Sequence, residues 1–185
     1  SNPIFHPHGA WTVGRAIDAE VIPFNGRLML YCATRDPQMR IQMLAAASAP
    51  LDSDYSRPCW TPLGDGPVLC PELPWEYECI EAPTFCLREG RLVMFYAGGY
   101  NCQPQQIGVA VSEDGLHWRR LSDEPLLRHG RPGEWNASES GHPGVFVDDD
   151  GQTYLFYQGC DDGGKTWFLS QVKIGWRDEM PYVVI

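Results

Sequence analysis

Three ionisable residues, Asp18, Glu81 and His142, stand at the start of three similar stretches of the sequence. Carboxyl and imidazole side chains serve acid–base chemistry and ligand binding, and they can act together if the fold brings them close. Glu81 is the most unusual of the three, because it stands directly before Ala-Pro and an apolar strand, where a charged side chain has no packing role. The elements that carry these residues therefore decide whether they form a site.

The three stretches share one layout: an apolar strand, a turn of the Asn-Gly or Asp-Gly type, and a second strand rich in aromatic residues. They read IDAEVIPFNGRLMLYCATRD from residue 17, IEAPTFCLREGRLVMFYAGG from residue 80 and GHPGVFVDDDGQTYLFYQGCD from residue 141. Aligned on the turn glycines Gly26, Gly90 and Gly151, the three ionisable residues head the first strand, 63 and 61 residues apart. This pattern predicts one hairpin used three times.

A repeat of about sixty residues with four strands is typical of a β-propeller blade. Further strands are predicted in IQMLAAAS, IGVAVSEDGLHWRRL and WFLSQVKIGW, and the apolar segment 39–49 is predicted to be a buried strand rather than a helix. The sequence thus predicts an all-β chain that forms a single, partial β-propeller domain over residues 1–185. Its three blades are expected at approximately 12–75, 76–135 and 136–185.

The first strand of each propeller blade lines the central channel, and its starting residues point into one end of that channel. Asp18, Glu81 and His142 are therefore expected to converge from three neighbouring blades. The alternative is that each is a solvated residue at the start of a strand. Glu20 follows Asp18 by two residues and is expected to share its strand face.

The composition argues against several classes of function. The chain has 24 acidic and 14 basic residues, and its formal charge of -10 opposes binding to nucleic acid or to an anionic membrane surface. No apolar run approaches the roughly 18 residues of a membrane span, and residues 1–20 lack the features of a signal peptide. The seven cysteines lack the spacing of a zinc or redox site and are expected to be mostly buried thiols, which favours a cytoplasmic over a secreted location.

Five motifs, taken in order, resemble the five-bladed propeller glycosidases of glycoside hydrolase family 43 and match the three C-terminal blades of that fold. The motifs are IDAEV at 17–21, IEAPTF at 80–85, SEDGLHW at 112–118, GHPGVFVDDDG at 141–151 and WRDEMPYVV at 176–184. The last motif departs from the family's usual ending, because Glu179 and Met180 stand where that family has Gly-Trp. The resemblance implies a five-bladed fold of which this chain carries about three blades.

The resemblance also implies roles for the three ionisable residues. Glu81 matches the family's general acid, Asp18 the aspartate that orients the acid and keeps it protonated, and His142 a histidine near the channel axis. Inverting hydrolysis of a glycosidic bond needs such an acid and a carboxylate that activates water. That base is expected about two blade periods upstream of Asp18, outside this chain. In an alternative alignment Asp18 is itself the base, but the orienting aspartate is then missing.

No cofactor is required by this chemistry, although the resemblance implies a structural calcium or sodium ion near the channel axis, with His142 as its neighbour. Sugars are bound by flat aromatic faces and by polar groups. The residues expected to contact substrate are Trp75, Tyr77, Trp11, Trp135 and Glu20.

Two further motifs, Glu78-Cys79 and Arg35-Asp36-Pro37, are similar to motifs of invertase-type propellers. Glu78 is an alternative to Glu81 as the acid. The Arg-Asp-Pro motif follows the second strand of its blade and is expected to lie away from the channel.

The predicted function is a glycosidase that hydrolyses arabinose-, xylose- or similar linkages in an oligosaccharide or polysaccharide, with inversion. Two alternatives stay open: a non-catalytic or degenerate carbohydrate-binding propeller, and a glycoside phosphorylase that uses phosphate in place of activated water. A phosphorylase needs a basic cluster for its anion, and the candidates are Arg128, His129 and Arg131. Because three blades leave sheet edges and faces uncovered, association with the missing blades or with a second copy is also expected.

Overall fold

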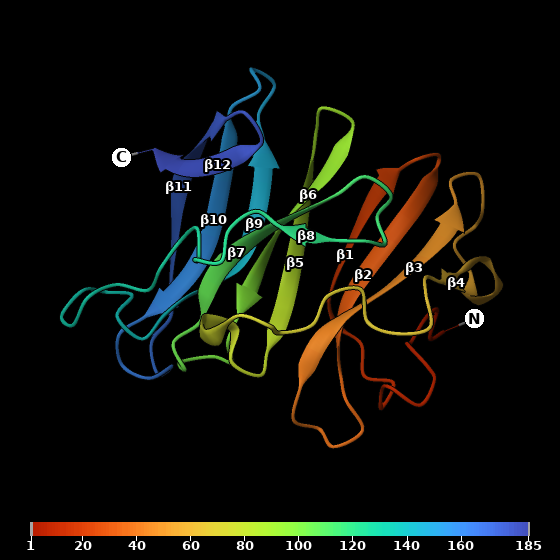
Figure 1. The fold of residues 1–185 in the computed structure, drawn as a ribbon, viewed down its shortest axis with the longest axis horizontal. Helices are drawn as coiled ribbons and strands as arrows, with labels where there is room; N and C mark the ends of the chain where they lie inside the picture. The colour runs from red at the N-terminus through yellow and green to blue at the C-terminus, as the bar shows by residue number, and fades with distance from the viewer. Residues whose placement is uncertain (1, 185) are drawn as a thin grey trace.

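Three four-stranded antiparallel sheets make up the computed structural model, which describes residues 2–184 (Figure 1). The strands of each sheet follow the order of the chain. The first sheet contains β1 (Ile17–Phe24), β2 (Arg27–Arg35), β3 (Gln42–Pro50) and β4 (Thr61–Pro62). The second contains β5 (Ile80–Arg88), β6 (Arg91–Gly98), β7 (Gln106–Ser112) and β8 (Arg119–Arg120). The third contains β9 (Glu139–Val147), β10 (Thr153–Cys160), β11 (Phe168–Arg177) and β12 (Met180–Val184).

The all-β prediction is confirmed, and the three sheets fall within the ranges expected for the three blades. Two short 3₁₀ helices, η1 (Arg57–Cys59) and η2 (Pro74–Glu76), lie in the connection between the first and second sheets. None of the helices in the described residues is long and apolar enough to cross a membrane.

Tight turns close the first two hairpins. Asn25-Gly26 joins β1 to β2 and Glu89-Gly90 joins β5 to β6, and all four residues have positive φ angles, as a type I′ turn requires. The third hairpin differs, because Val147 of β9 pairs with Thr153 of β10 and the turn between them spans residues 148–152. The turns that the sequence predicts are therefore present, with one of them longer than the others.

The side chains of the central strands fill the interfaces between the sheets. On β6, Leu92, Met94 and Tyr96 face the first sheet, whereas Val93 and Phe95 face the third. Strands that are covered on both faces have continuous apolar sequences rather than alternating ones. The first eight residues of β3 are buried for the same reason, which confirms the buried strand predicted there.

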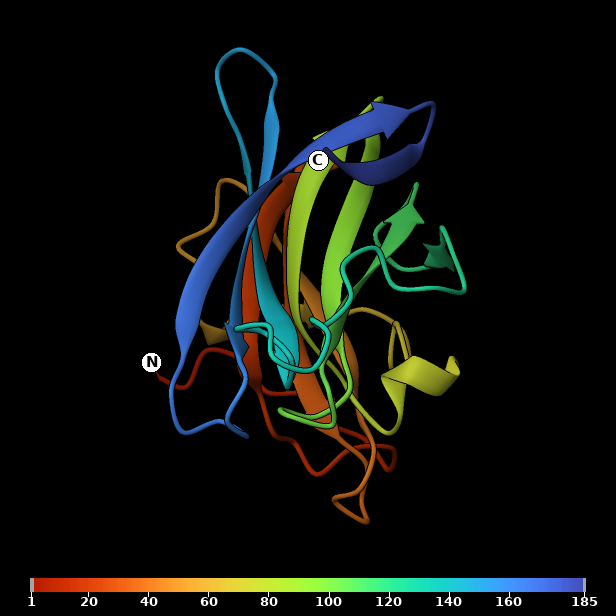
Figure 2. The same ribbon diagram turned by 90° about the vertical axis from the view of Figure 1, so that its left-hand side faces the viewer.

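The first strands of the three sheets are neighbours, with β5 between β1 and β9 (Figure 1). Figure 2 shows the molecule from the side of the third sheet. The third sheet has one face against the second sheet and one outward face. The described chain does not cover the outward face, where Phe146, Phe156 and Tyr182 are about half exposed. A further sheet or a second copy of the chain, as expected from the sequence, would pack on this face, and that expectation stays a prediction.

A buried ion pair fixes the segment that leads into β5. Glu76 of η2 is fully buried, and its carboxylate accepts hydrogen bonds from Arg120 Nε and Nη2, both at 2.8 Å, and from the Tyr96 hydroxyl at 2.7 Å. The backbone N–H groups of Glu72 and Leu73 donate to the same carboxylate. Arg120 also pairs with the exposed carboxylate of Glu72 at 2.9 Å. The network ties the linker between two sheets to β6 and β8.

Asp114 closes the turn between β7 and β8. Its carboxylate accepts hydrogen bonds from the backbone N–H groups of Leu116 and His117, both at 2.8 Å, and lies 2.7 Å from His117 Nδ1. Partial burial acts to raise the pKa of Asp114, but the hydrogen bonds from His117, Leu116 and Ser112 outweigh it and hold the pKa below its usual value.

Asp114→Ala is expected to lower the free energy of unfolding at pH 7 by about 1 kcal/mol, as loss of a capping carboxylate does. Because the folded-state pKa is lowered, this contribution is complete above the unfolded-state pKa of about 3.9 and is lost as the pH falls below it. Urea denaturation at pH 7 and at about pH 3 would measure the difference. Glu113→Ala is the control, and a destabilisation by Asp114→Ala that does not depend on pH would contradict the prediction.

All seven cysteines are free thiols, and four of them are buried. Burial raises the pKa of Cys32 to about 12 and that of Cys86 to about 11, so these groups hold little thiolate at neutral pH. Cys102 and Cys160 are close to each other, with their sulfur atoms 3.8 Å apart. The expectation of mostly buried thiols agrees with this arrangement.

Candidate functional site

The three ionisable residues lie where the first strand of each sheet is distorted by a bulge. The pairing slips by one residue between Ile17 and Glu20 in β1, between Glu81 and Thr84 in β5, and between Gly141 and Gly144 in β9. A bulge interrupts the regular alternation of side chains and redirects some of them, and it is common next to active sites. The distortion therefore allows side chains at the strand start to turn into the channel.

Glu81 does not occupy the same position in its strand as the other two ionisable residues. The bulged residue with positive φ is Asp18 (52°) in β1, Ala82 (47°) in β5 and His142 (46°) in β9. Glu81 precedes this position by one residue. Counted back from the turn glycines, Asp18 is eight residues away (26 − 18), whereas Glu81 and His142 are each nine (90 − 81 and 151 − 142). The glycines thus align Glu81 with Ile17, and His142 is level with Glu81 in this count only because the third turn is longer.

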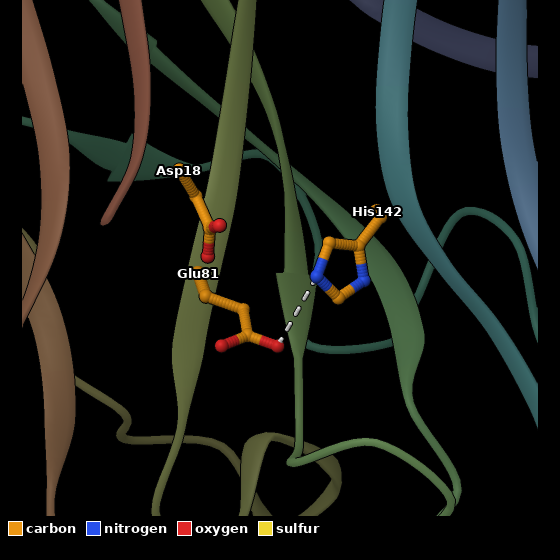
Figure 3. A group of neighbouring side chains, drawn as sticks. All are labelled: Asp18, Glu81 and His142. Carbon is orange, nitrogen blue, oxygen red and sulfur yellow. Dashed lines mark ion pairs between the residues drawn. The ribbon is translucent and has the colours of Figure 1, made fainter. Parts of the chain in front are cut away.

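The side chains nevertheless converge, as expected from the sequence (Figure 3). One potential ligand atom from each of Asp18, Glu81 and His142 lies within 4.8 Å of the others. Glu81 Oε1 is 3.7 Å from His142 Nε2. Glu81 is buried, with 6% of its surface exposed, whereas His142 is partly buried and Asp18 is exposed. The group therefore has a buried end and a solvent-accessible end.

Two glutamine amides hold the buried Glu81 carboxyl group. Gln105 Nε2 donates to Glu81 Oε1 at 2.7 Å, and Gln42 Nε2 donates to Glu81 Oε2. Gln42 is itself oriented by Arg35, whose Nε donates to Gln42 Oε1 at 3.0 Å. Both oxygens of Glu81 thus receive an N–H group, and a proton carried by Glu81 has to point away from both amides.

A second buried carboxyl group, that of Glu139, lies behind His142. Glu139 Oε1 accepts a hydrogen bond from Gln158 Nε2 at 2.9 Å and is 3.9 Å from His142 Nδ1, while Oε2 accepts the backbone N–H of Cys102. Burial raises the pKa of Glu139, although the hydrogen bonds from Gln158 and Cys102 act to lower it. His142 is therefore packed between polar groups on the side away from the channel.

An open hollow of about 270 Å³ lies beside the three ionisable residues. Its lining comes from the starts of β1, β5 and β9, namely Asp18, Ala19, Glu20, Ala82, Pro83, Thr84, His142, Pro143 and Gly144. Asp18 and Glu20 share this hollow as expected, and burial raises the pKa of Glu20. The hollow joins carboxyl groups, an imidazole and small apolar side chains, which is the mixture found in small-molecule sites.

Two of the residues predicted to bind sugar pack against aromatic side chains. Trp75 stacks on Tyr96 with ring centroids 5.9 Å apart and covers Gly98 and Gly108. Trp135 packs against Tyr157 and Phe168 at the end of the third sheet. The Trp75 ring is occupied by packing, whereas Trp135 stays 37% exposed, and substrate contact stays a prediction for both residues.

Trp11 packs on the outer face of the first sheet. It lines a different hollow of about 520 Å³, together with Ala45, Pro62 and Asp65. This hollow contains none of the three converging residues, so Trp11 is not brought to the candidate site.

Tyr77 and Glu78 lie at the surface just before β5. Tyr77 is half exposed and contacts Gly99, whose carbonyl accepts the Gln105 amide that holds Glu81. The Glu78 side chain is 50% exposed and pairs with Arg40 at 3.4 Å. The structure thus leaves Tyr77 beside the loop next to the site and separates Glu78 from the buried carboxyl group.

Arg35 was expected to lie away from the channel, and this was wrong. Its side chain bonds to Gln42, which in turn bonds to Glu81, and its guanidinium group stacks over Tyr100 at 5.0 Å. The reason is that Arg35 ends β2 directly opposite Gln42 at the start of β3. Pairing across strands, which sequence order does not display, brings it to the site.

The three converging side chains alone do not make a calcium or sodium site. They offer two carboxylates and one imidazole nitrogen, whereas Ca²⁺ takes six to eight oxygen ligands. An imidazole with two carboxylates suits a transition metal better. The ion implied by the sequence resemblance therefore stays an expectation, and no chemical step is assigned to it.

Sequence reasoning missed Gln42 and Gln105. Each precedes the long apolar run of the third strand in its sheet and forms an isolated parallel bridge to the next sheet, Gln42 with Cys79 and Gln105 with Glu139. The available signal was a glutamine before an apolar run, repeated at the same interval of 63 residues that separates Asp18 from Glu81. The repeat thus places one glutamine on each side of Glu81.

A model of the family described as "Glycosyl hydrolases family 43" matches residues 3–181, nearly the whole chain. This chain belongs to glycosyl hydrolase family 43. Family 43 membership agrees with the motifs around Asp18, Glu81 and His142 and with the arrangement of the three sheets.

Solved structures share this family 43 fold at low sequence identity. An α-L-arabinofuranosidase from Lactobacillus brevis is 20% identical, with a TM-score of 0.67 over 91% of this chain and 55% of that one. An endo-1,4-β-xylanase from Bacteroides thetaiotaomicron is 16% identical, with a TM-score of 0.69 over 96% of this chain and 60% of that one. These likenesses confirm the predicted partial β-propeller.

A curated relative adds a different chemistry. A β-1,2-mannobiose phosphorylase from Thermoanaerobacter sp. (strain X514) is 27% identical over 136 residues, which cover 65% of this chain and 43% of that protein. The family 43 chain described here spans about half the length of these relatives.

Proposed function

We propose that this chain supplies part of the active site of an inverting glycoside hydrolase, with Glu81 as the proton donor to the leaving oxygen and Asp18 as the carboxylate that orients it. The convergence of Asp18, Glu81 and His142, two of which line an open hollow, carries this proposal. Family 43 membership supports the reaction class. The amides of Gln42 and Gln105 hold the Glu81 carboxyl in one position beside Asp18 and His142, which line the hollow.

The short separation between Asp18 and Glu81 supports the orienting role of Asp18. An inverting acid and base are about 6.5–9.5 Å apart, which leaves room for the attacking water. One oxygen atom of Asp18 lies within 4.8 Å of one of Glu81, a closer approach than expected for an acid and a base with a water between them. This closeness favours a base other than Asp18, in agreement with the expectation from the sequence.

The proposed substrates are oligosaccharides or polysaccharides with arabinose, xylose or similar residues. This choice of substrate is in keeping with the names of the solved structures that share the fold, two α-L-arabinofuranosidases and an endo-1,4-β-xylanase. In the hollow, Asp18, Glu20 and His142 offer hydrogen-bonding groups for sugar hydroxyls, and the side chains of Ala19 and Pro143 offer apolar surface.

The test is the stereochemistry of hydrolysis, measured with the longest native form of the protein. Proton NMR of the first product formed from an aryl arabinofuranoside or xyloside is expected to show the inverted anomer. Retention would contradict the proposal and assign Asp18 as a nucleophile, because retaining carboxyl pairs are about 5–5.5 Å apart. Calorimetric binding of oligosaccharide with no turnover would favour the non-catalytic alternative.

A glycoside phosphorylase is a second candidate, and the mannobiose phosphorylase relative is the observation that favours it. The predicted anion cluster is not assembled at the site, since Arg128 pairs with Glu124 at 2.6 Å and, within residues 2–184, no hydrogen bond or ion pair links Arg128, His129 or Arg131 to Glu81. Arg35, through Gln42, is the cation nearest to Glu81 in the hydrogen-bond network.

Phosphate dependence separates the two candidates. We expect the rate of glycoside cleavage to stay within about twofold when inorganic phosphate is removed, because hydrolysis uses water as the nucleophile. Release of sugar would be followed in phosphate-free buffer and in buffer with phosphate. A rate that falls to background without phosphate, with a sugar 1-phosphate as the product, would establish the phosphorylase and refute hydrolysis.

A further inference from the structure

Gln105 is fully buried and contacts both members of the inner part of the site. Its Nε2 donates to Glu81 Oε1 at 2.7 Å, and its Oε1 lies 2.9 Å from His142 Nδ1. Glu81 and His142 belong to different sheets, so this one amide bridges the second and third sheets at the site.

The orientation of the Gln105 amide follows from its neighbours. Its Nε2 also donates to the Gly99 carbonyl at 2.8 Å. The reversed amide would place its oxygen against this carbonyl and against the Glu81 carboxyl, which are both acceptors. The amide oxygen therefore faces His142 Nδ1, and Nδ1 carries the proton that binds it.

Two neighbours favour the other tautomer, the Gln158 amide and the Glu81 carboxyl group. Gln158 Nε2 lies 3.1 Å from His142 Nδ1, farther than the Gln105 oxygen, and donates an N–H group to Glu139 at 2.9 Å. Glu81 Oε1 lies 3.7 Å from His142 Nε2, beyond hydrogen-bond distance. The shorter contact with Gln105 favours Nδ1–H, which leaves the lone pair of Nε2 on the side of Glu81.

Gly141 provides the space for this amide. A Cβ atom on Gly141 would overlap the amide oxygen of Gln105 and approach its Cδ at 2.6 Å. The φ angle of Gly141 is not in the left-handed region, so backbone conformation does not require glycine there. Gly141 occupies the position in the third sheet that Glu81 holds in the second. The Gln105 amide fills the space that a side chain at this position would take.

We propose that Gln105 is a positioning residue that holds the Glu81 carboxyl and the His142 ring as one unit, and that Gly141 is glycine because the Gln105 amide fills the space of its side chain. The catalytic consequence rests on the proposed function, because it concerns Glu81 as the proton donor. The structural consequence, the tautomer of His142, does not rest on it.

The first test is the tautomer of His142, read from the ¹⁵N spectrum of histidine-labelled protein near pH 8.5, where imidazoles are mostly neutral. Loss of one signal set in His142→Asn assigns the residue. The wild type is expected to show Nδ1–H, and Gln105→Met and Gly141→Ala are expected to shift His142 towards Nε2–H. An Nε2–H tautomer in the wild type, or no change in either variant, would overturn the proposal.

The second test is kinetic. Gln105→Met keeps the length of the side chain and removes its hydrogen bonds, and Gly141→Ala displaces an unchanged Gln105. Each is expected to lower kcat about 10²-fold with little change in KM, since a small misplacement of a catalytic group has that effect. The double variant is expected to be no worse than either single variant, because both remove the same interaction.

Matched controls separate positioning from a general loss of structure. Gln106→Met is the same substitution one residue along, and Gly66→Ala adds a Cβ where nothing lies within 4 Å; both are expected to keep wild-type kcat. Thermal unfolding would establish that all variants are folded at the assay temperature. Additive losses, or unchanged kcat in folded Gln105→Met, would refute the proposal. An inactive wild type would refute the proposed function alone, because the histidine spectra still test the role of Gln105.

Discussion

Glu81→Gln is expected to lower kcat for a glycoside with a poor leaving group by about 10²–10⁴-fold, the usual contribution of a general acid. Glutamine has nearly the shape of the glutamate, but it has no acidic proton to give to the leaving oxygen. The buried carboxyl group, its contact with His142 and its closeness to Asp18 make it the group best placed for this role. Steady-state kinetics on a series of aryl glycosides would measure the loss.

The dependence on the leaving group distinguishes a lost acid from a disturbed site. A glutamine at position 81 also turns one NH₂ group towards the amide of Gln42 or Gln105, which both donate to Glu81, so some misplacement accompanies the substitution. An acidic phenol needs no protonation to depart. The loss is therefore expected to shrink strongly with a dinitrophenyl glycoside, whereas misplacement alone would affect all substrates alike.

Glu78→Gln is the matched control. Glu78 was the alternative acid on sequence grounds, and its exposed side chain pairs with Arg40 at the surface. The Glu78→Gln variant is expected to keep wild-type kcat on every substrate. Activity that survives Glu81→Gln unchanged, or that disappears in Glu78→Gln, would contradict the assignment.

Glu76→Gln is expected to lower the free energy of unfolding by about 3–5 kcal/mol, the usual cost of removing one partner of a buried ion pair. The Glu76 carboxylate is fully buried, and the side chain of its partner Arg120 is only 11% exposed. Glutamine cannot accept both hydrogen bonds of the guanidinium group, so Arg120 keeps its charge in a buried place without a counter-charge. Urea denaturation of the folded chain would measure the change.

Glu72→Gln removes the other partner of the same arginine and serves as the control. The Glu72 side chain is 70% exposed, and such pairs contribute about 0–1 kcal/mol. The ratio between the two effects tests whether burial decides the cost. Equal losses in the two variants, or a loss below about 1 kcal/mol for Glu76→Gln, would show that Arg120 finds another partner or reaches water.

The strands and most of the turns could be predicted because they rest on local interactions. The Asn25-Gly26 pair adopts the positive φ angles of a tight hairpin turn, and the Glu89-Gly90 pair adopts the same conformation. The apolar run of β3 belongs to a strand because both of its faces are covered by neighbouring parts of the chain. The sixty-residue repeat then implied that β1, β5 and β9 would lie together, which placed Asp18, Glu81 and His142 in one group.

Details of the site could not be predicted, because they depend on how strands from different sheets meet. The bulges show that Glu81 is offset by one residue from Asp18 and His142, and the longer third turn hides this offset for His142. Trp75 and Trp135 precede the site residues closely in sequence, yet their rings pack against other aromatic side chains, Trp75 on Tyr96 and Trp135 on Tyr157. Arg35 shows the reverse case, since it looks remote in sequence and is brought close by pairing with Gln42.

By itself the sequence determined the repeat, the all-β fold and the identity of the three converging ionisable residues, because a strand, a turn and a period are properties of neighbouring residues. Only the tertiary structure decided which groups surround Glu81. The amides of Gln42 and Gln105 reach it from the starts of two other strands, and the space for Gln105 exists because Gly141, in a third sheet, has no side chain. Such contacts depend on distances of a few tenths of an ångström between segments far apart in the chain, and residue order alone does not specify them.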